Sequence, residues 1–460
     1  MKKLMIKDIC EGVKGELLLG QEDAYIENIC IDSRKAKDGD LFFALIGENH
    51  DAHKFIPMAK ESGCKSFVVS KEESVTELKG CEEINVVLVE NTTKALQDLA
   101  SYYLSTFDMK KIGVTGSTGK TTTKDMLYYI CSEKYKTARN IGNFNNEIGL
   151  PLTVLGFEEG TEVGILEMGM SSFGEISLLA DIVRPEVGVI TNIGVSHIEN
   201  LGDREGILKA KLEITDFFNE NNVLVVNETN DLLTRENTLG GYKLVTIGNN
   251  GKSDFVISEI VDNGDEGIGF TIEHNLQRQR FELSIPGRHN AINGSLAVAA
   301  AMELGITMEE AARGLAKMEL TDKRLNIKNK DGIKVIDDTY NASPDSMKAG
   351  IDVLVASKGE RKIAILADML EMGKDAPKYH AEVGTYAAEK NVDLLIAVGP
   401  NSKYMAEAAE EALGKDRVLH YAERETLLTE IKGLLKVGDI VLVKGSRGMA
   451  MDQVVNKIVE

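Results

Sequence analysis

The chain has 460 residues, and its 73 Asp and Glu against 53 Lys and Arg give a formal net charge of −20. This length is too great for one hydrophobic core, and at roughly 100–200 residues per domain it predicts two to four domains. The acidic surplus argues against a partner with an extended phosphate backbone, because nucleic-acid-binding proteins usually carry a basic surface. A small phosphorylated ligand needs only a local positive site, and it stays compatible with this charge.

The start of the chain and the cysteines favour a cytoplasmic protein. Lys7 and Asp8 interrupt the first apolar residues, so no secretory signal is predicted. The sequence contains no uninterrupted run of about 18 apolar residues, so no membrane span is predicted. The five cysteines are scattered and form no C-x-x-C pair, which is typical of reduced thiols rather than of a disulfide framework or a zinc site.

The first hundred residues alternate short apolar runs with stretches of helical spacing, and they predict a small α/β unit. Its expected strands are 41–46, 66–69 and 85–89, and its expected helices are 53–62 and 93–104. At residues 105–111 the pattern resets with a polar segment. We therefore expect a first domain at residues 1–107.

A second series of apolar runs follows at residues 163–167, 187–191 and 223–227. Strands that are apolar throughout and that alternate with helices indicate a mostly parallel sheet covered on both faces. An alanine-rich helix at 289–304 closes this central domain, which we expect at residues 108–318. Ligands of such sheets bind beyond the carboxyl ends of the strands.

The remaining residues, 319–460, predict a third domain with a Rossmann-like, doubly wound sheet. Its expected strands are 333–337, 362–366, 392–398 and 439–443, and its expected helices are 344–355, 379–390, 403–412 and 424–435. The fold class is therefore α/β, with a small N-terminal domain, a central domain of the phosphate-loop type and a C-terminal doubly wound domain.

The clearest chemical signal is a glycine-rich loop between a strand and a helical pattern, Gly113-Val-Thr-Gly-Ser-Thr-Gly-Lys-Thr-Thr-Thr. Glycines let the backbone aim several N–H groups at one point, and the helix N-terminus adds the positive end of its dipole. Polyphosphate is the natural occupant, with Lys120 neutralising its oxygens and the Thr121 hydroxyl ligating Mg²⁺. Val114 stands where the standard motif has its first glycine, and an ordinary turn is the alternative. The residues expected to bind ATP or GTP are Gly116, Ser117, Thr118, Gly119, Lys120, Thr121 and Thr122.

Ionisable side chains follow two of the central strands. Glu167 ends the strand at 163–167, where a carboxylate beside a phosphate loop suits a metal ligand, and a solvated loop glutamate is the alternative. His197 lies past the next strand, and for it the alternative is a structural histidine. Lys209 and Lys211 lie in a predicted helix, where composition alone favours a solvated face.

In order and spacing, the chain resembles the Mur ligase family of ATP-dependent amide-forming enzymes over nearly its whole length. The resemblance lies in Thr115-Gly-Ser-Thr-Gly-Lys-Thr-Thr, Asn143-Phe-Asn-Asn-Glu-Ile-Gly-Leu-Pro, Leu166-Glu-Met-Gly, Asn192-Ile-Gly-Val-Ser-His, Ala210-Lys-Leu-Glu-Ile, Gly287-Arg-His-Asn-Ala-Ile-Asn and Asp337-Asp-Thr-Tyr-Asn-Ala-Ser-Pro. It implies that Lys211, fourteen residues after His197, is carbamylated. A carbamate is a carboxylate-like metal ligand, and it requires a neutral amine and hence a lowered lysine pKa.

The resemblance also assigns the metal and the nucleotide. It implies two Mg²⁺ ions around the ATP γ-phosphate, and it implies that Lys120, Glu167, His197 and Lys211 are catalytic. The expected metal ligands are Thr121, Glu167, His197 and carbamylated Lys211. Asn290 and Asn293 are expected to lie at the adenine. Arg324 is expected to reach the nucleotide from the third domain, and Asp338 is expected to bind the ribose hydroxyls. The alternatives are an N-cap role for Asn290 and metal binding by the adjacent Asp337 and Asp338.

Within the family, the first-domain segments Asp32-Ser-Arg and Gly39-Asp-Leu-Phe-Phe-Ala-Leu-Ile-Gly-Glu are similar to the region that binds UDP-muramyl substrates. The resemblance implies joining of D-alanyl-D-alanine to UDP-N-acetylmuramoyl-tripeptide through an acyl phosphate, by an enzyme expected to be a monomer. The expected substrate residues are Ser33, Arg34, Asn145, Asn146, Asn341 and Arg447. For the asparagines the alternative is turn structure, and for Arg447 a surface turn. Ala52, Ser343 and Ala367 depart from the family pattern.

Three other functions remain open from the sequence. A ligase that adds a diamino acid carries an Asp-Asn-Pro-Arg motif in its third domain, and this chain has none. An enzyme similar to folylpolyglutamate synthetase is the second alternative. A regulatory protein with a phosphate loop is the third, although such a protein would not need Glu167, His197 and Lys211.

Overall fold

The computed structural model describes residues 1–81, 83–319 and 323–460. Its first unit contains a five-stranded sheet of order β2-β7-β6-β5-β4. β2 is antiparallel to β7, and the other neighbours are parallel. A separate antiparallel pair joins β1 to β3. The elements are β1 Leu4–Met5, α1 Ile6–Val13, β2 Glu16–Leu19, β3 Tyr25–Ile26, β4 Asn28–Cys30, β5 Asp40–Phe43, α2 Ile56–Glu61, β6 Ser66–Val69, β7 Asn85–Leu88 and α3 Thr92–Ser105.

The central unit is a nine-stranded sheet of order β16-β15-β14-β13-β12-β11-β8-β10-β9. Its pairs are parallel from β9 to β14, and β15 is antiparallel to both β14 and β16. Its strands are β8 Lys110–Thr115, β9 Thr137–Arg139, β10 Val163–Glu167, β11 Val187–Ile190, β12 Val223–Asn227, β13 Lys243–Gly248, β14 Phe255–Asp262, β15 Ile268–His274 and β16 Gln277–Leu283. Its helices are α4 Lys120–Cys131, α5 Gly149–Leu155, α6 Glu175–Val183, α7 Ile198–Leu201, α8 Arg204–Leu212, α9 Arg235–Thr238, α10 His289–Met302 and α11 Met308–Ala316.

The third unit is a six-stranded sheet of order β17-β18-β22-β19-β20-β21, parallel except for the pair of β17 and β18. Apolar residues of α12, α13 and α14 cover one face, and those of α15 and α16 cover the other, which is the doubly wound arrangement. The elements are β17 Asn326–Lys330, β18 Ile333–Asp338, α12 Pro344–Ala356, β19 Lys362–Ala367, α13 Ala376–Glu389, β20 Leu394–Val398, α14 Ser402–Leu413, β21 Val418–Tyr421, α15 Arg424–Leu434, β22 Ile440–Lys444 and α16 Asp452–Val459.

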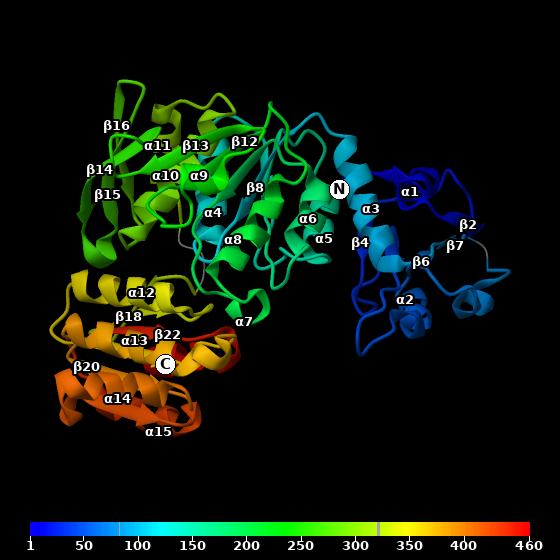
Figure 1. Cartoon of the computed structure of the whole chain (residues 1–460). Coiled ribbons are helices and arrows are strands. Elements are labelled where there is room, and N and C mark those ends of the chain that lie inside the picture. The colour runs from blue at the N-terminus through cyan, green and yellow to red at the C-terminus, as the bar shows by residue number, and fades with distance from the viewer. Residues whose placement is uncertain (82, 320–322) are drawn as a thin grey trace.

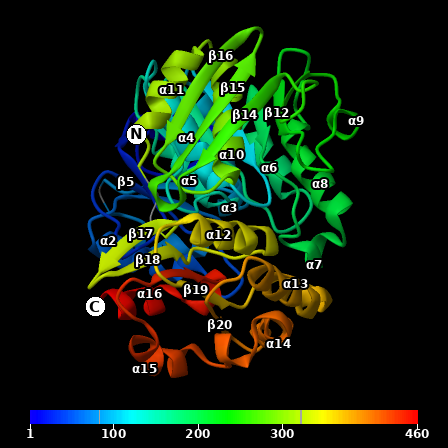
Figure 2. The same ribbon diagram turned by 90° about the vertical axis from the view of Figure 1, so that its left-hand side faces the viewer.

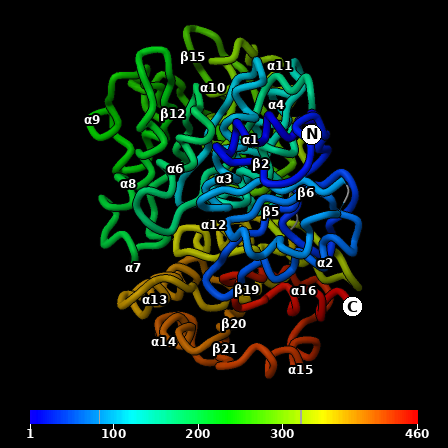
Figure 3. Tube along the Cα trace, turned by 90° about the vertical axis from the view of Figure 1, so that its right-hand side faces the viewer, coloured from blue at the N-terminus to red at the C-terminus, as the bar shows by residue number. Residues whose placement is uncertain are grey.

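The three units pack in the order of the chain. Figure 1 shows the first unit in blue beside the central unit, and the third unit in yellow to red below it. Helix α3 packs on α1 and on α5 and α6, and it lies between them in Figure 1 and faces the viewer in Figure 3. One hydrophobic core therefore runs through the first and central units. In Figure 2, α12 lies directly beneath the central unit. The third unit therefore closes the edge of the central sheet at which ligands are expected.

The three-part α/β organisation predicted from the sequence is confirmed, and the strands at 163–167 and 223–227 have the predicted bounds. The predicted helix 53–62 is a 3₁₀ turn, Ala52–Phe55, followed by α2, because Pro57 lies in the first turn of the α-helix, where its missing N–H costs nothing. The antiparallel strands β14 to β16 and the edge strand β21 were not predicted. In the described ranges, no helix is both long and apolar enough to cross a membrane.

Candidate functional site

The phosphate loop joins the carboxyl end of β8 to the start of α4, and two of its glycines are required by their surroundings. Gly116 has φ 149°, and a Cβ there would lie 1.8 Å from Thr191 Oγ1. Gly119 has φ 78°, and its Cβ would lie 2.7 Å from Asn293 Oδ1. A side chain at position 116 would displace the neighbouring strand end, and one at position 119 would displace the Asn293 side chain of α10. The glycines therefore bring the loop against both elements.

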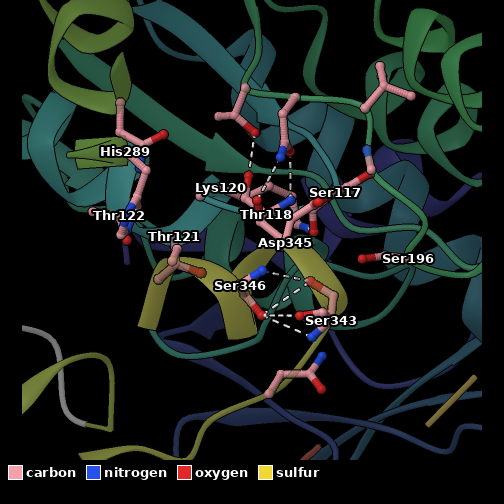
Figure 4. A pocket seen from close by; sticks show the side chains of 18 of the residues that line it. Ser117, Thr118, Lys120, Thr121, Thr122, Ser196, His289, Ser343, Asp345 and Ser346 are labelled. Atoms are coloured by element: carbon pink, nitrogen blue, oxygen red, sulfur yellow. Dashed lines mark hydrogen bonds between the residues drawn. The ribbon is translucent and has the colours of Figure 1, made fainter. Parts of the chain in front are cut away.

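Asn192, which follows β11, holds this loop in shape. Its backbone oxygen accepts from Ser117 N at 3.0 Å, and its side-chain Oδ1 accepts from Thr118 N at 2.8 Å. Its Nδ2 donates to Thr118 Oγ1 at 2.7 Å, and Gly194 N donates to Ser117 Oγ at 2.9 Å. Figure 4 shows Ser117, Thr118 and Lys120 grouped at the loop. The conformation of the loop is thus fixed by the neighbouring strand end.

Lys120 begins helix α4, so the first-turn N–H groups have no acceptor within the helix and add positive potential at the loop. Its Nζ donates to Gly116 O at 2.7 Å. Burial lowers the pKa of Lys120, Arg324 lowers it further, and Glu167 opposes both. The N-terminal end of α4 is therefore electropositive, as an anion site requires.

Glu167 ends β10 with a carboxylate whose two oxygens are both held. Oε2 accepts from Thr121 Oγ1 at 2.8 Å, and Oε1 accepts from Asn145 Nδ2 at 2.8 Å. A hydroxyl, a carboxylate and phosphate oxygens form a ligand set that Mg²⁺ prefers, and this pair fits such a site. Among the described residues, no group of three or more His, Cys, Asp or Glu side chains is placed to hold a metal. The protein ligands would therefore act together with the nucleotide phosphates.

His197 precedes α7 and has φ 62°, a backbone conformation that is uncommon for residues other than glycine. Its Nδ1 lies 2.7 Å from Glu371 Oε2 of the third unit, although their relative orientation does not meet hydrogen-bond geometry. Burial lowers the pKa of His197, Glu371 opposes this, and Lys120 and Lys211 lower it further. The cause is desolvation of the imidazolium in a cluster that already holds two lysines.

Lys211 lies on α8 with its residue 2% exposed. Burial, with the nearby Lys120 charge, lowers the pKa of Lys211 well below its usual range. The side chain is thus a buried amine whose charged form is less favoured than that of a solvated lysine. This is the property that carbamylation requires, and the solvated-face alternative for Lys211 is wrong.

A cleft of about 850 Å³ lies between the central and third units. Most of the predicted site residues border it, namely Ser117, Thr118, Gly119, Lys120, Thr121, Thr122, Asn145, Asn146, Glu167, His197, Asn290, Asn293, Arg324, Asp338 and Asn341. Gly116 and Lys211 do not border the cleft. The residues come from the carboxyl ends of β8, β10, β11 and β18 and from the start of α10, in agreement with the edge expected for a ligand.

The nucleotide candidates occupy both walls of this cleft. Asn290 is not the N-cap of α10, since Arg288 holds that position. Its Nδ2 donates to Pro286 O at 2.7 Å, and its Oδ1 accepts from Asn293 at 3.0 Å. On the opposite wall, the Arg324 guanidinium lies 4.0 Å from the centre of the Tyr340 ring. The two walls belong to different units.

The adjacent carboxylates at the end of β18 have different surroundings. Asp338 accepts from Lys444 Nζ at 2.6 Å and borders the cleft. Asp337 is buried, accepts from Lys328 Nζ at 2.9 Å and from Thr339 Oγ1 at 2.7 Å, and does not border the cleft. The two carboxylates face different partners, which argues against metal binding by the pair.

The substrate candidates fall in three places. Asn145, Asn146 and Asn341 border the main cleft, whereas Arg447 borders a neighbouring cavity of about 260 Å³ together with His197. Ser33 and Arg34 lie in the first unit and border neither cavity. Ser33 donates to Met58 Sδ at 3.3 Å, and Arg34 pairs with Asp32 at 2.8 Å. The structure thus does not bring the first-unit candidates to the phosphate loop.

Three sequence models describe the chain in the same order as its three units. They are the Mur ligase family catalytic domain at residues 25–104, the Mur ligase middle domain at residues 114–301 and the Mur ligase glutamate ligase domain at residues 323–447. The chain belongs to the Mur ligase family.

Full-length relatives agree with this assignment. The UDP-N-acetylmuramoyl-tripeptide–D-alanyl-D-alanine ligase of Bacillus subtilis (strain 168) is 40% identical over 463 residues, which span 100% of this chain and 99% of that protein. A crystal structure of MurF from Acinetobacter baumannii has a TM-score of 0.90 at 30% identity, covering 100% of this chain and 99% of that one. The MurF ligase of Thermotoga maritima in complex with ADP has a TM-score of 0.82 at 28% identity, covering 94% and 97%.

Sequence reasoning missed three residues that support this Mur ligase site. Asn192 stands within a motif already quoted, and its position before His197 was the available signal. Lys124 follows Lys120 by one helical turn, and its buried Nζ lies 3.9 Å from Glu167 Oε2. Glu371 comes from a segment of the third unit, and nothing in the sequence pairs it with His197.

Proposed function

We propose that this Mur ligase joins D-alanyl-D-alanine to UDP-N-acetylmuramoyl-tripeptide at the expense of ATP, in peptidoglycan precursor synthesis. The observation that carries the proposal is the convergence of the phosphate loop, Glu167 and His197 at one cleft, with Lys211 buried within electrostatic reach of Lys120 and His197, in a chain 40% identical over its full length to a relative of that name. A ligase that adds a diamino acid, a folylpolyglutamate synthetase-like ligase and a regulatory nucleotide-binding protein are less favoured, because the full-length relative carries the D-alanyl-D-alanine name.

In the proposed reaction, the terminal carboxylate of the tripeptide attacks the γ-phosphorus of ATP and gives an acyl phosphate and ADP. The dipeptide amine then attacks the acyl carbon, and inorganic phosphate leaves. A carboxylate is a poor electrophile until one of its oxygens becomes a phosphate leaving group. The protein therefore mainly positions three ligands and neutralises spreading negative charge. Lys120 and the N-terminus of α4 supply that charge, and Asn192 keeps the loop N–H groups oriented.

We further propose that Thr121, Glu167, His197 and carbamylated Lys211 hold two Mg²⁺ ions. Bound Mg²⁺ would neutralise the phosphate oxygens and orient the γ-phosphate. The protein contributes a carboxylate fixed by Thr121 and Asn145, and a lysine amine whose charged form is disfavoured because it is buried beside Lys120. Carbon dioxide adds to the neutral form of that amine, and the amine loses a proton.

The remaining roles follow the two walls of the cleft. Asn290 and Asn293 would contact adenine, Arg324 the phosphates and Asp338 the ribose. Ser33 and Arg34 would bind the UDP part of the substrate in the first unit, while Asn145, Asn146, Asn341 and Arg447 would contact the peptide parts. Because these groups lie on different units, the chemistry requires the units to close around the ligands.

The proposed domains are residues 1–107, 108–318 and 319–460, for the UDP-linked substrate, for ATP and for closure. The last boundary adjoins residues 320–322, which are outside the described part of the chain. We also propose that the enzyme acts as a cytoplasmic monomer. Sedimentation of the purified chain with and without ligands measures that oligomeric state.

The test is ADP release from ATP and UDP-muramyl-tripeptide with a panel of amines. We expect turnover with D-alanyl-D-alanine and little with diaminopimelate, lysine or glutamate. Turnover with only a diamino acid or with only glutamate would contradict the proposed specificity for D-alanyl-D-alanine and would identify that amine as the substrate. Absence of ADP release with every amine would favour the regulatory protein.

A further inference from the structure

We propose that Glu371 is a positioning residue for His197, and that it links the third unit to the metal site of the central unit. Its carboxylate would hold Nδ1 of the imidazole so that Nε2 is presented toward the phosphate loop. This inference rests on the function proposed above and adds a residue that the proposed site does not contain.

The geometry of the pair is the first support. Glu371 Oε2 lies 2.7 Å from His197 Nδ1, a distance that suits a charge-assisted contact although the present orientation is not that of a hydrogen bond. A metal-ligating imidazole almost always gives its other ring N–H to a carboxylate, a backbone carbonyl or a water, which fixes its tautomer and orientation. A hydrogen bond from Nδ1 to Glu371, formed by a small rotation of either side chain, would place the proton on Nδ1 and leave the lone pair of Nε2 free to bind.

The backbone at both residues is the second support. His197 has φ 62° and Glu371 has φ 63°, so two non-glycine residues with left-handed backbones meet across the boundary between two units. Such conformations are unfavourable for residues with a Cβ, and they concentrate at functional sites that hold them in place. Two such backbone conformations at one contact would be an unusual coincidence if the contact had no functional role.

The third support is the frame that presents Glu371. The preceding residues are held by two buried or half-buried contacts, Met369 N to His380 Nε2 at 3.0 Å and Leu370 N to Ser446 Oγ at 2.9 Å. Farther back, Asp368 accepts from Ser402 N at 2.7 Å at the start of α14. The segment that carries Glu371 is therefore anchored to the third unit, and Glu371 moves with that unit.

The same segment touches the element that follows His197. The 3₁₀ turn Gly373–Asp375 contacts α7, and a Cβ on Gly373 would lie 3.2 Å from Glu199 Cβ. Movement of the third unit away from the central unit would break this contact and the Glu371 pair together. His197 would then lose its orienting carboxylate, so the metal site is complete only when the two units are closed.

The experiment compares Glu371→Gln and Glu371→Asp with wild type and with Glu411→Gln, a change of an exposed glutamate on α14. We expect Glu371→Gln to lower kcat about tenfold and to raise the Mg²⁺ concentration for half-maximal rate several-fold, as for other partners of metal-binding histidines. The KM for D-alanyl-D-alanine should stay within about twofold of wild type, since the proposed role of Glu371 is to orient His197 rather than to bind the dipeptide. Glu371→Asp should recover part of the loss, and Glu411→Gln should match wild type.

A second measurement does not depend on turnover. ADP alone, in EDTA, should raise the melting temperature equally in Glu371→Gln and in wild type. The further rise when Mg²⁺ is added together with ADP should be smaller in Glu371→Gln than in wild type. The Glu371 side chain is 55% exposed, so the variant is expected to fold, and if it does not, Glu371→Asp decides by the same measurement.

Two results would overturn the inference. One is a wild-type Mg²⁺ requirement and Mg²⁺-dependent melting shift in the variant. The other is a rise in the KM for the dipeptide alone, which would make Glu371 a substrate ligand instead. Failure of the proposed function is distinguishable, because wild type itself would then release no ADP with D-alanyl-D-alanine.

Discussion

Gly116 approaches Thr191 so closely that a Cβ on the glycine would lie 1.8 Å from the threonine hydroxyl oxygen. This contact joins the phosphate loop to the end of the neighbouring strand, and it leaves no room for any side chain at position 116. The position of the loop relative to β11, and hence to His197, depends on it.

Gly116→Ala should abolish most ATP turnover, because the loop must shift to remove the clash. A control is Gly160→Ala, where φ is 77° but a Cβ meets nothing within 4 Å. That control carries the backbone strain alone, about 1 kcal/mol of unfolding free energy. The kcat for ADP release and urea unfolding measure the two effects. Equal activity in both alanine variants would contradict the steric argument.

Lys211→Ala should inactivate the enzyme, and bicarbonate should not restore it, because the alanine variant cannot form a carbamate. Wild type freed of carbon dioxide should lose activity and regain it when bicarbonate is added, since a buried amine with a lowered pKa is available to react. Intact-mass measurement of the protein near neutral pH should show the added carbon dioxide. Full activity of Lys211→Ala without bicarbonate would end the carbamate proposal.

Arg324→Ala should raise the KM for ATP and lower kcat, because this guanidinium borders the cleft from the third unit and rests on Tyr340. We expect about a tenfold loss in kcat/KM, which corresponds to about 1.4 kcal/mol. Arg278→Ala, on the β16 hairpin, is the matched control because its guanidinium contacts Glu259 and Glu273 outside the cleft. Steady-state kinetics at varied ATP provide the readout, and unchanged constants would mean that Arg324 does not contact nucleotide.

Lys124→Met should destabilise the protein by about 3 kcal/mol, because a buried charged network loses one partner. The Lys124 ammonium donates to Asn140 O at 2.8 Å and lies 3.9 Å from Glu167 Oε2, with its side chain 2% exposed. Lys134→Met also removes a lysine that donates to a backbone oxygen, but at the surface, and it should cost less than about 1 kcal/mol. Urea denaturation compares the two variants. A small cost for Lys124→Met would show that its charge is dispensable for folding.

Stability should fall below about pH 6.5, where unfolded histidines gain a proton. Burial lowers the pKa of His380, whose Nε2 accepts the Met369 N–H, so the folded state binds fewer protons than the unfolded state in acid. The contribution is present above the unfolded pKa, and it is lost as the pH falls toward the folded pKa. Unfolding free energies at about pH 7.5 and about pH 5.5 should differ less in His380→Gln than in wild type. An equal difference in both proteins would assign the acid sensitivity elsewhere.

The elements predicted most accurately from the sequence are those that the local residue pattern determines. The strands β10 and β12 are buried throughout and apolar up to their last residue, so their bounds follow from local composition. The strands β14 and β16 escaped prediction because several of their residues are exposed, and the mixed polar pattern resembles a loop. Their antiparallel pairing with β15 depends on tertiary contacts that no short window contains.

The functional site likewise has features that the local sequence marks and features that depend on tertiary packing. The phosphate loop and Glu167 are visible because glycine spacing and a strand end mark them in the sequence. The pairing of His197 with Glu371 depends on how two separately folded units meet, and the burial of Lys211 depends on what covers one face of α8. A solvated lysine and a structural histidine were reasonable alternatives until the packing was known.

The most direct measurement starts from UDP-muramyl-tripeptide labelled with oxygen-18 in its terminal carboxylate. With ATP, Mg²⁺ and D-alanyl-D-alanine, we predict one labelled oxygen in the released phosphate for each amide bond formed, because the carboxylate oxygen leaves with the phosphoryl group. Mass spectrometry of phosphate and of the extended UDP-linked peptide reads both quantities. Unlabelled phosphate, or ADP formed without the extended peptide, would contradict the account.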